Sequence, residues 1–223
     1  MSDGPVSAPV SDGPVVMDIS TDPAAAVDAA VACLQSGGVV VLPTETVYGV
    51  AALAADPSAV EELFVRKGRP ADRRVAVLVA DLDQARSVAE VDARAAGLAS
   101  ACWPGPLTMV LEAVPGSAES TMGVRCPDHS LVRAIASAVG PIATTSANRS
   151  GDPTPVDAAS AAASLGGDLL VLDGGPCAGV PSTVVDLTTD PATILREGTV
   201  TVDDLEASGI RVEPASAAPG ADR

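Results

Sequence analysis

From residue 22 to about residue 208, Ala-rich helical patterns alternate with short runs of Val, Ile and Leu typical of buried strands. Most helical patterns open on an Asp, which caps a helix N-terminus, and Asp22 and Asp56 are each followed by Pro, which favours the first turn. Helices are predicted over residues 24–35 and 56–66, from Asp81, from Asp92, from Asp128 or Ser130 to Gly140, and over 157–165 and 202–207. Strands are predicted over 39–42, 75–79, 107–111, 122–125, 142–145, 169–172, 183–187 and 193–195. The alternation predicts an α/β fold, and the closely spaced late strands predict a mixed rather than an all-parallel sheet.

The two ends of the chain lack this pattern. Residues 1–18 repeat SDGPV, at 2–6 and again at 11–15, and we expect them to form a disordered N-terminal tail. Residues 213–223, which read EPASAAPGADR, are expected to form a disordered C-terminal tail. The 223-residue chain therefore predicts one domain, over residues 19–212.

The composition indicates a core of small side chains. Hydrophobic residues make up 47% of the chain, yet it has one Trp, one Tyr and one Phe, so the core must consist of Ala, Val and Leu. No apolar run approaches the roughly 18 residues that span a bilayer. The N-terminal residues have neither a basic segment nor an apolar segment of a secretory signal, so we expect a cytoplasmic location and no membrane.

The charge of −16 disfavours broad binding to nucleic acid, which needs a basic surface. It does not exclude a small anion in a focused basic pocket. Lys67 and Arg69 stand close together in a chain with 13 basic and 29 acidic side chains. A nucleotide triphosphate would explain such a pair, because Arg forks match phosphate oxygens and Lys adds a point charge. The alternative is that the two cations stand at a helix C-terminus, where they interact favourably with the helix macrodipole.

Several familiar site chemistries are excluded. The chain has no phosphate-binding GxxxxGK[ST] loop, no GxGxxG turn and no GxSxG elbow. Its four cysteines form no CxxC pair and His129 is its one histidine, so we expect neither a zinc site nor a His-dependent triad, and no protein metal site. What remains is a set of hydroxyl and cationic residues in loops that follow strands. Ligands of α/β proteins bind at such loops, although a capped turn is the alternative for each.

Seven motifs in order resemble those of the YrdC-like family, the threonylcarbamoyl-AMP synthases of tRNA modification. The first is GGVVVLPTETVYG at residues 37–49, and the match covers about residues 22–208. The others are KGRP at 67–70, WPGPLT at 103–108, VRCPDH at 124–129, TTSANRSG at 144–151, STVVD at 182–186 and LREG at 195–198. The resemblance implies a twisted mixed β-sheet flanked by helices around a concave, positively charged ligand cavity. It also implies the short, single-domain form of the family.

The activity that the resemblance implies is the synthesis of threonylcarbamoyl-AMP and pyrophosphate from L-threonine, bicarbonate and ATP, with Mg²⁺ entering on ATP. The product would pass to a separate tRNA threonylcarbamoyl transferase, and direct binding of tRNA is expected to be weak or absent. In this reaction an anionic carbamate attacks the α-phosphorus of an anionic nucleotide, so the protein must mainly position the partners and neutralise charge. Such chemistry has little need of a histidine base.

The resemblance assigns roles to eleven residues, and each assignment has a structural alternative such as a cap, a turn or a surface ion pair. Lys67 and Arg69 would be catalytic. ATP would be bound by Lys67, Arg69, Thr121, Ser146, Asn148, Thr154 and Arg196. Threonine would be bound by Thr46, Arg125, Thr144 and Ser182.

The chain departs from the family pattern after the Lys-x-Arg element. Arg74 stands at a usual Pro position, and Leu78 stands where some members have a His that contacts threonine. Arg73 and Arg74 are candidates for additional charge at the nucleotide entrance. Two other functions remain open, namely a non-catalytic RNA-binding relative and a paralogue that acts on another carbamoyl-type adenylate. Salt-dependent RNA binding and an amino-acid panel would separate them from the synthase.

Overall fold

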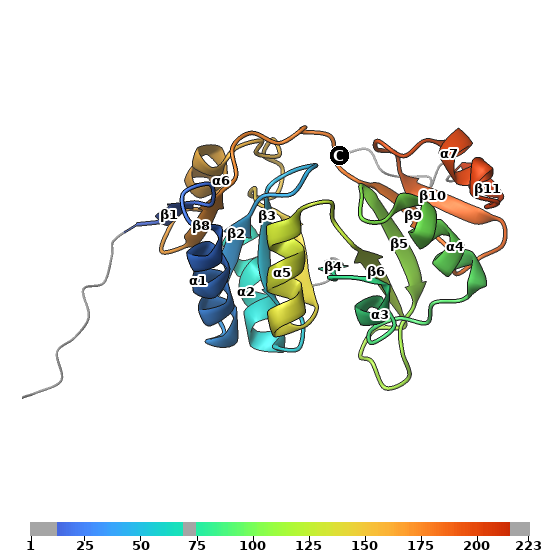
Figure 1. Ribbon diagram of the computed structural model, residues 1–223, viewed down its shortest axis with the longest axis horizontal. Coiled ribbons are helices and arrows are strands. Elements are labelled where there is room, and N and C mark those ends of the chain that lie inside the picture. The colour runs from blue at the N-terminus through green and yellow to red at the C-terminus, as the bar shows by residue number, and fades with distance from the viewer. Residues whose placement is uncertain (1–12, 69–74, 215–223) are drawn as a thin grey trace, which may run out of the picture.

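The computed structural model describes residues 13–68 and 75–214. In these residues eleven strands form one sheet with seven helices around it (Figure 1). The strands are β1 (Val15–Asp18), β2 (Val40–Leu42), β3 (Gly49–Leu53), β4 (Ala76–Leu78), β5 (Leu107–Glu112), β6 (Thr121–Arg125), β7 (Ile142–Ser146), β8 (Leu170–Asp173), β9 (Thr183–Asp186), β10 (Ala192–Arg196) and β11 (Val212–Pro214). The helices are α1 (Pro23–Gln35), α2 (Pro57–Lys67), α3 (Leu82–Ala85), α4 (Ala93–Cys102), α5 (Ser130–Val139), α6 (Ala158–Leu165) and α7 (Val202–Ala207).

The sheet is mixed, as the sequence predicts. Its order is β1-β8-β2-β3-β7-β4-β6-β5-β9-β10-β11. The pairs β1–β8, β2–β8, β4–β6, β5–β9 and β10–β11 are parallel, and the other five are antiparallel. The α/β fold with a mixed sheet is thus confirmed.

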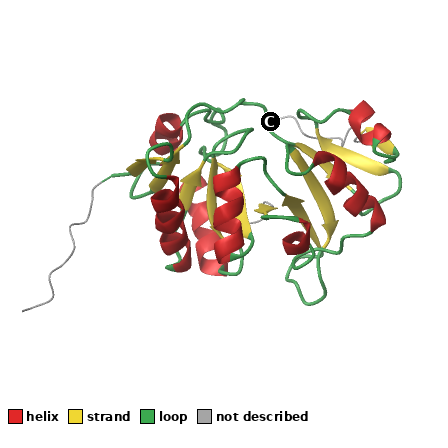
Figure 2. Ribbon diagram, in the orientation of Figure 1, coloured by secondary structure: helices red, strands yellow, loops and turns green. Residues whose placement is uncertain are grey.

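Alternation along β2 explains why helices cover both faces of that half of the sheet. Val39 and Val41 belong to a buried cluster that includes residues of α2 and α6, whereas Val40 and Leu42 belong to one that includes residues of α1 and α5. Successive side chains of a strand point to opposite faces, so a run of four apolar residues needs cover on both. Figure 2 shows these helices gathered around the strands of one half.

A third cluster fills the other half, where α3, α4 and α7 pack on β5, β6, β9 and β10. Its partly buried Trp103 donates from Nε1 to the carbonyl oxygen of Leu107 at 2.7 Å. Trp103 is therefore a packing and hydrogen-bonding element of this half. No helix in the described residues is long and apolar enough to cross a membrane.

Five predicted aspartate caps are confirmed by hydrogen bonds from backbone N–H groups of the first turns, at Asp22, Asp56, Asp81, Asp92 and Asp157. The predicted cap of α5 is wrong: neither Asp128 nor Ser130 caps it. The N-cap residue is His129, whose side chain makes no capping hydrogen bond.

The predicted tails are too long at both inner ends. Val15–Asp18 form an edge strand, β1, which pairs in parallel with β8, although we expected a disordered tail to residue 18. Val212–Pro214 form β11 beside β10, although we expected a tail from residue 213. In both cases the neighbouring strand supplies the hydrogen bonds that local sequence does not reveal. Residues 1–12 and 215–223 lie outside the described residues.

Candidate active site

A cavity of about 400 Å³ lies across the middle of the sheet. Residues of seven strands that follow one another in the sheet, from β3 to β10, contribute to its lining. The predicted site residues that line it are Arg125, Thr144, Ser146, Thr154, Ser182 and Arg196. None of its described lining residues is acidic, although the whole chain carries a net charge of −16. The volume is typical of a small-molecule site.

Glycine keeps the floor of this cavity open where β3 and β7 meet. Gly49 is paired with Ser146, and a Cβ atom on Gly49 would lie 2.8 Å from Thr144 Oγ1. The Thr144 hydroxyl donates to the carbonyl oxygen of Val50 at 3.1 Å, so its position is fixed by the neighbouring strand. Thr144, which was predicted to bind the substrate threonine, therefore lies in the cavity wall. Its hydroxyl oxygen can still accept a hydrogen bond from a ligand.

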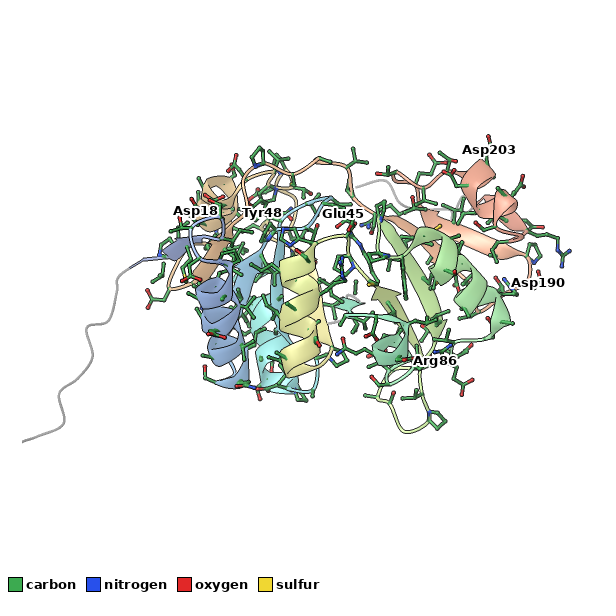
Figure 3. The ribbon with its side chains drawn as sticks, in the orientation of Figure 1. Asp18, Glu45, Tyr48, Arg86, Asp190 and Asp203 are labelled. Atoms are coloured by element: carbon green, nitrogen blue, oxygen red, sulfur yellow. The ribbon has the colours of Figure 1, made fainter. Side chains whose placement is uncertain are left out.

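Arg125, the last residue of β6, is only 6% exposed. Its Nε donates to the carbonyl oxygen of Gly105 at 3.1 Å. Its Nη2 lies 2.7 Å from Oε1 of Glu45, in the loop between β2 and β3, which Figure 3 labels near the middle of the molecule. Nη2 and both Glu45 oxygens are buried and have no hydrogen-bond partner among the described residues. The contact is therefore a close ion pair that lacks the alignment of a hydrogen bond.

Arg196, at the end of β10, holds Ser182 in the cavity wall. Its Nε and Nη2 both donate to the carbonyl oxygen of Ser182, at 3.0 and 2.8 Å, and Nη2 also lies 3.0 Å from the Ser182 hydroxyl. That hydroxyl in turn lies 2.9 Å from Oγ1 of Thr108. Burial lowers the pKa of the Arg196 guanidinium, and the charge of Arg125 lowers it further. The two guanidinium groups thus repel each other across the site, and an anion bound between them would offset this repulsion.

Lys67 contacts Ser146 and Asn148, to which the resemblance assigned the same ligand, ATP, but it does not line the cavity. Its ammonium donates to the carbonyl oxygens of both residues, at 2.6 Å to Asn148. It also lies 3.4 Å from the hydroxyl of Ser146 and 3.5 Å from Oδ1 of Asn148. Lys67 therefore ties the C-terminal end of α2 to the loop after β7, and the helix ends at Gly68 with a left-handed cap.

Three other predicted residues lie away from the lining, and one lies outside the described residues. Thr46 is buried, with its hydroxyl 2.8 Å from Oγ1 of Thr44. Asn148 turns its amide inward to the carbonyl oxygens of Arg149 and Asp152. Thr121 opens β6 opposite Glu112 and is not among the lining residues. Arg69 lies outside the described residues, as do Arg73 and Arg74.

The sequence reasoning missed three lining threonines, Thr44, Thr108 and Thr145. Thr44 stands two positions before the predicted Thr46, and its Oγ1 accepts from the backbone N–H groups of Thr46 and Val47 at 3.2 and 3.1 Å. Thr108 lies at the second position of β5 in the WPGPLT motif. Its distance from Ser182 in sequence concealed it, because parallel pairing of β5 and β9 brings the two together.

The titratable groups behind Arg125 are held neutral. Burial lowers the pKa of His129, and the charge of Glu45 opposes that shift by less. Burial raises the pKa of the Cys126 thiol to about 11, and its Sγ donates to the carbonyl oxygen of Ala80 at 3.3 Å. A neutral thiol is a poor nucleophile, so Cys126 serves as a packed side chain.

The described residues contain no group of three or more His, Cys, Asp or Glu side chains that could hold a metal ion. The site therefore consists of two guanidinium groups and a ring of hydroxyl groups on a concave sheet. It can orient anions and hydrogen-bond polar substrates, and its own groups offer positioning and charge stabilisation.

Comparisons with known proteins show which family the chain resembles. Residues 32–198 match the family model Sua5_yciO_yrdC, described as "Telomere recombination". The chain is 40% identical to a threonylcarbamoyl-AMP synthase of Pyrococcus abyssi over 82% of its own length and 57% of the relative's. It is 41% identical to a putative threonylcarbamoyl-AMP synthase of Mycobacterium tuberculosis, strain H37Rv, over 78% of its own length and 84% of that protein.

Solved structures show the same fold. The crystal structure of P. abyssi Sua5 complexed with L-threonine superposes with a TM-score of 0.79 at 34% identity, covering 90% of this chain and 62% of that one. The chain thus spans little more than half the length of the P. abyssi relative. The mixed β-sheet flanked by helices that the motifs led us to expect is the fold these proteins share.

Proposed function

The chain belongs to the Sua5/YciO/YrdC family, and on that premise we propose that it is an L-threonylcarbamoyladenylate synthase. The reaction joins L-threonine, bicarbonate and ATP to give threonylcarbamoyl-AMP and pyrophosphate. Its product serves the threonylcarbamoyladenosine modification of tRNA through a separate transferase. A cytoplasmic location is part of the same proposal, because ATP and tRNA are found there.

One observation carries the proposal: in a chain of net charge −16, Arg125 and Arg196 line one cavity together with hydroxyl groups, and no described lining residue is acidic. The reaction must bring a carbamate against the α-phosphate of a nucleotide, and both are anions. Fixed cations and oriented donors lower the barrier to such an encounter without proton transfer from the protein.

The proposed roles follow from where each group lies. Arg125 holds the threonine carboxylate, because its guanidinium is buried at the cavity wall. Arg196 faces the nucleotide, and Ser182 and Thr144 hydrogen-bond threonine. Ser146 and Thr154 lie in the lining for the nucleotide. The Lys67 ammonium already donates to carbonyl oxygens at the end of β7 and in the loop after it, so a phosphate would have to share it with them. The proposed roles of four other residues rest on the resemblance alone: Arg69, Asn148, Thr46 and Thr121.

Mg²⁺ is proposed to arrive with ATP. The described residues offer no acidic cluster for it, which fits a cation that keeps several waters and binds through substrate phosphates. Bound in this way, Mg²⁺ would neutralise phosphate charge. The chain's own guanidinium and hydroxyl groups would bind and orient the organic substrates around it.

The test is pyrophosphate release with each substrate omitted in turn and with a panel of amino acids in place of threonine. We expect release that requires ATP, bicarbonate and L-threonine together. Arg125→Lys should lower kcat/KM for threonine by about 100-fold, because Lys cannot form the bidentate contact that a guanidinium makes with a carboxylate. The matched control is Arg86→Lys, which alters an exposed ion pair with Asp83 outside the cavity and should leave activity unchanged.

Release that does not depend on bicarbonate would contradict the proposed reaction. Equal activity of folded Arg125→Lys and wild type would contradict the proposed site. A preference for another amino acid in the panel would identify a paralogue with a different carbamoyl-type product. Tight RNA binding that weakens steeply with salt, in the absence of any pyrophosphate release, would instead favour the RNA-binding alternative.

A further inference from the structure

Glu45 presents an acidic group next to a cavity that is otherwise cationic. Its Oε1 lies 2.7 Å from Nη2 of Arg125, which lines the cavity. Of its side chain 23% is exposed, yet both carboxylate oxygens are buried. Neither oxygen accepts a hydrogen bond from any described residue. A buried carboxylate without donors carries a desolvation cost, so these two oxygens have unused capacity for a ligand that brings N–H groups.

The neighbours of Glu45 do not supply such donors. The Nε of Arg125 donates to the carbonyl oxygen of Gly105, and its Nη2 lies close to Glu45 without the alignment of a hydrogen bond. His129 has a buried Nδ1 that is also without a hydrogen-bond partner among the described residues. The Thr44 and Thr46 hydroxyls on either side of Glu45 bond to each other, and the Thr44 hydroxyl also bonds to the backbone of Val47.

A guanidinium beside a carboxylate is complementary to a zwitterion. An α-amino acid carries its ammonium and its carboxylate on one carbon atom, so its two charges are as close together as those of Arg125 and Glu45. The carboxylate of the amino acid can face Arg125 while its ammonium faces Glu45, and the four charges then alternate in sign. A simple carboxylate without an ammonium group would meet the repulsion of Glu45 with nothing to offset it, and this discrimination acts on the free amino acid, before its nitrogen is carboxylated.

We propose that Glu45 is a specificity-determining residue of this site, which binds the ammonium group of the free amino acid whose carboxylate Arg125 holds, before that nitrogen is carboxylated. The inference rests on the proposed function, because it concerns the amino-acid substrate of the same cavity. It adds a cause for the choice of substrate: Glu45 admits a zwitterion and disfavours simple carboxylates. It also explains why one acid stands beside a cavity whose described lining is free of acids.

A purely structural role for Glu45 makes a different prediction. If its carboxylate only holds Arg125 in place, its loss weakens every ligand that uses the guanidinium by the same factor. If it binds the amino group, its loss weakens only ligands that carry that group. The ratio of affinities for an amino acid and its deaminated analogue therefore separates the two roles.

The experiment uses the full chain with ATP present and measures binding of two probes by titration calorimetry. The first probe is L-threonine, and the second is 2,3-dihydroxybutanoate of the same configuration, in which a hydroxyl replaces the ammonium. Wild type should bind L-threonine about 10- to 100-fold more tightly, which is the worth of one hydrogen bond between charged groups. Glu45→Gln keeps the shape and removes the charge, and it should bring the ratio close to one mainly by weakening L-threonine.

The matched control is Glu62→Gln, which removes the carboxylate of the 2.8 Å ion pair with Arg66 on α2 and should leave both affinities unchanged. Pyrophosphate release is measured on the same preparations. Equal weakening of the two probes by Glu45→Gln overturns the inference and leaves a structural role. An unchanged affinity for L-threonine overturns it as well.

These outcomes are distinguishable from failure of the proposed function. Wild type that discriminates between the probes, with loss of discrimination in Glu45→Gln, supports the inference even if no pyrophosphate is released, and the synthase proposal alone then fails. Active synthase whose discrimination survives Glu45→Gln retains the proposed function and overturns the inference. Wild type that binds neither probe overturns both.

Discussion

Tyr48→Phe is the change whose cost follows most directly from the structure. Tyr48 is the largest fully buried side chain, and its hydroxyl donates to the carbonyl oxygen of Gly175 at 2.7 Å and accepts from the backbone N–H of Gly174 at 3.1 Å. Phe keeps the ring packing and removes both hydrogen bonds. Each is worth about 1 kcal/mol, so unfolding should become easier by about 2 kcal/mol. For a domain of this size the melting temperature should fall by about 4–8 °C.

The same change should loosen one wall of the cavity. The two hydrogen bonds anchor the beginning of the segment between β8 and β9, and that segment ends at Pro181 and Ser182, which line the site. We therefore expect KM for threonine to rise several-fold in Tyr48→Phe at temperatures where the variant is fully folded. Urea denaturation measures the loss of stability, and its slope should stay unchanged. Steady-state pyrophosphate release measures the rise in KM.

Gln84→Met is the matched control. Gln84 also accepts one backbone hydrogen bond and donates another, from the N–H of Ala80 at 2.7 Å and to the carbonyl oxygen of Ala136 at 2.8 Å, but it ties α3 to α5 away from the cavity lining. It should lose a similar free energy of unfolding while keeping its KM. The reasoning is refuted if Tyr48→Phe is as stable as wild type, or if both variants change KM equally.

Three further changes test other parts of the structure. Gly49→Ala places a Cβ atom 2.8 Å from Thr144 Oγ1 and should cost about tenfold or more in threonine affinity by calorimetry, whereas Gly97→Ala has open space in α4 and should stabilise the fold by about 0.5–1 kcal/mol. Because burial lowers the pKa of His129 in the folded state, the unfolded chain binds the proton first, so stability should fall as pH drops below about 6.5; His129→Gln should flatten this part of a urea-measured stability curve. Cys126, with its pKa raised to about 11, should be the slowest of the four cysteines to react with iodoacetamide at pH 8, as followed by peptide mass mapping.

Local signals made the helices predictable. Each confirmed aspartate cap satisfies backbone donors within three residues of itself, so its effect is written into a short stretch of sequence. His129 shows the limit of such signals: it stands between two better capping residues, Asp128 and Ser130, yet it holds the N-cap position. The loop from β6 sets where that helix begins, and it is fixed by Arg125 and Cys126, which are buried.

Three strands escaped prediction because their partners define them. β3 reads GVAAL, with little strand propensity of its own, and its pairing with β2 and β7 on either side makes it a central strand. β1 and β11 are edge strands of four and three residues, which pair with β8 and β10 respectively. Non-local hydrogen bonds of this kind leave little trace in the strand's own sequence.

The site was predictable as a set and less so by position. The structure brings Arg125, Thr144, Ser182 and Arg196, which the motifs named as site residues, to one cavity from four different strands or strand ends. The motifs did not distinguish Thr44 from Thr46, because the turn after β2 determines which hydroxyl faces the cavity. Thr46 instead bonds to its neighbour Thr44.

The partners of the basic side chains explain how an acidic chain keeps a positive site. On the surface, guanidinium groups pair with carboxylates that cancel their charge, as Arg66, Arg86 and Arg211 do. At the site, main-chain carbonyl oxygens hold the cations: Gly105 for Arg125, Ser182 for Arg196, and the loop after β7 for Lys67. A carbonyl orients a cation without neutralising it, so its full charge remains for a ligand. Glu45 is the exception, and it stands beside Arg125, where a bound amino acid would bring a positive charge of its own.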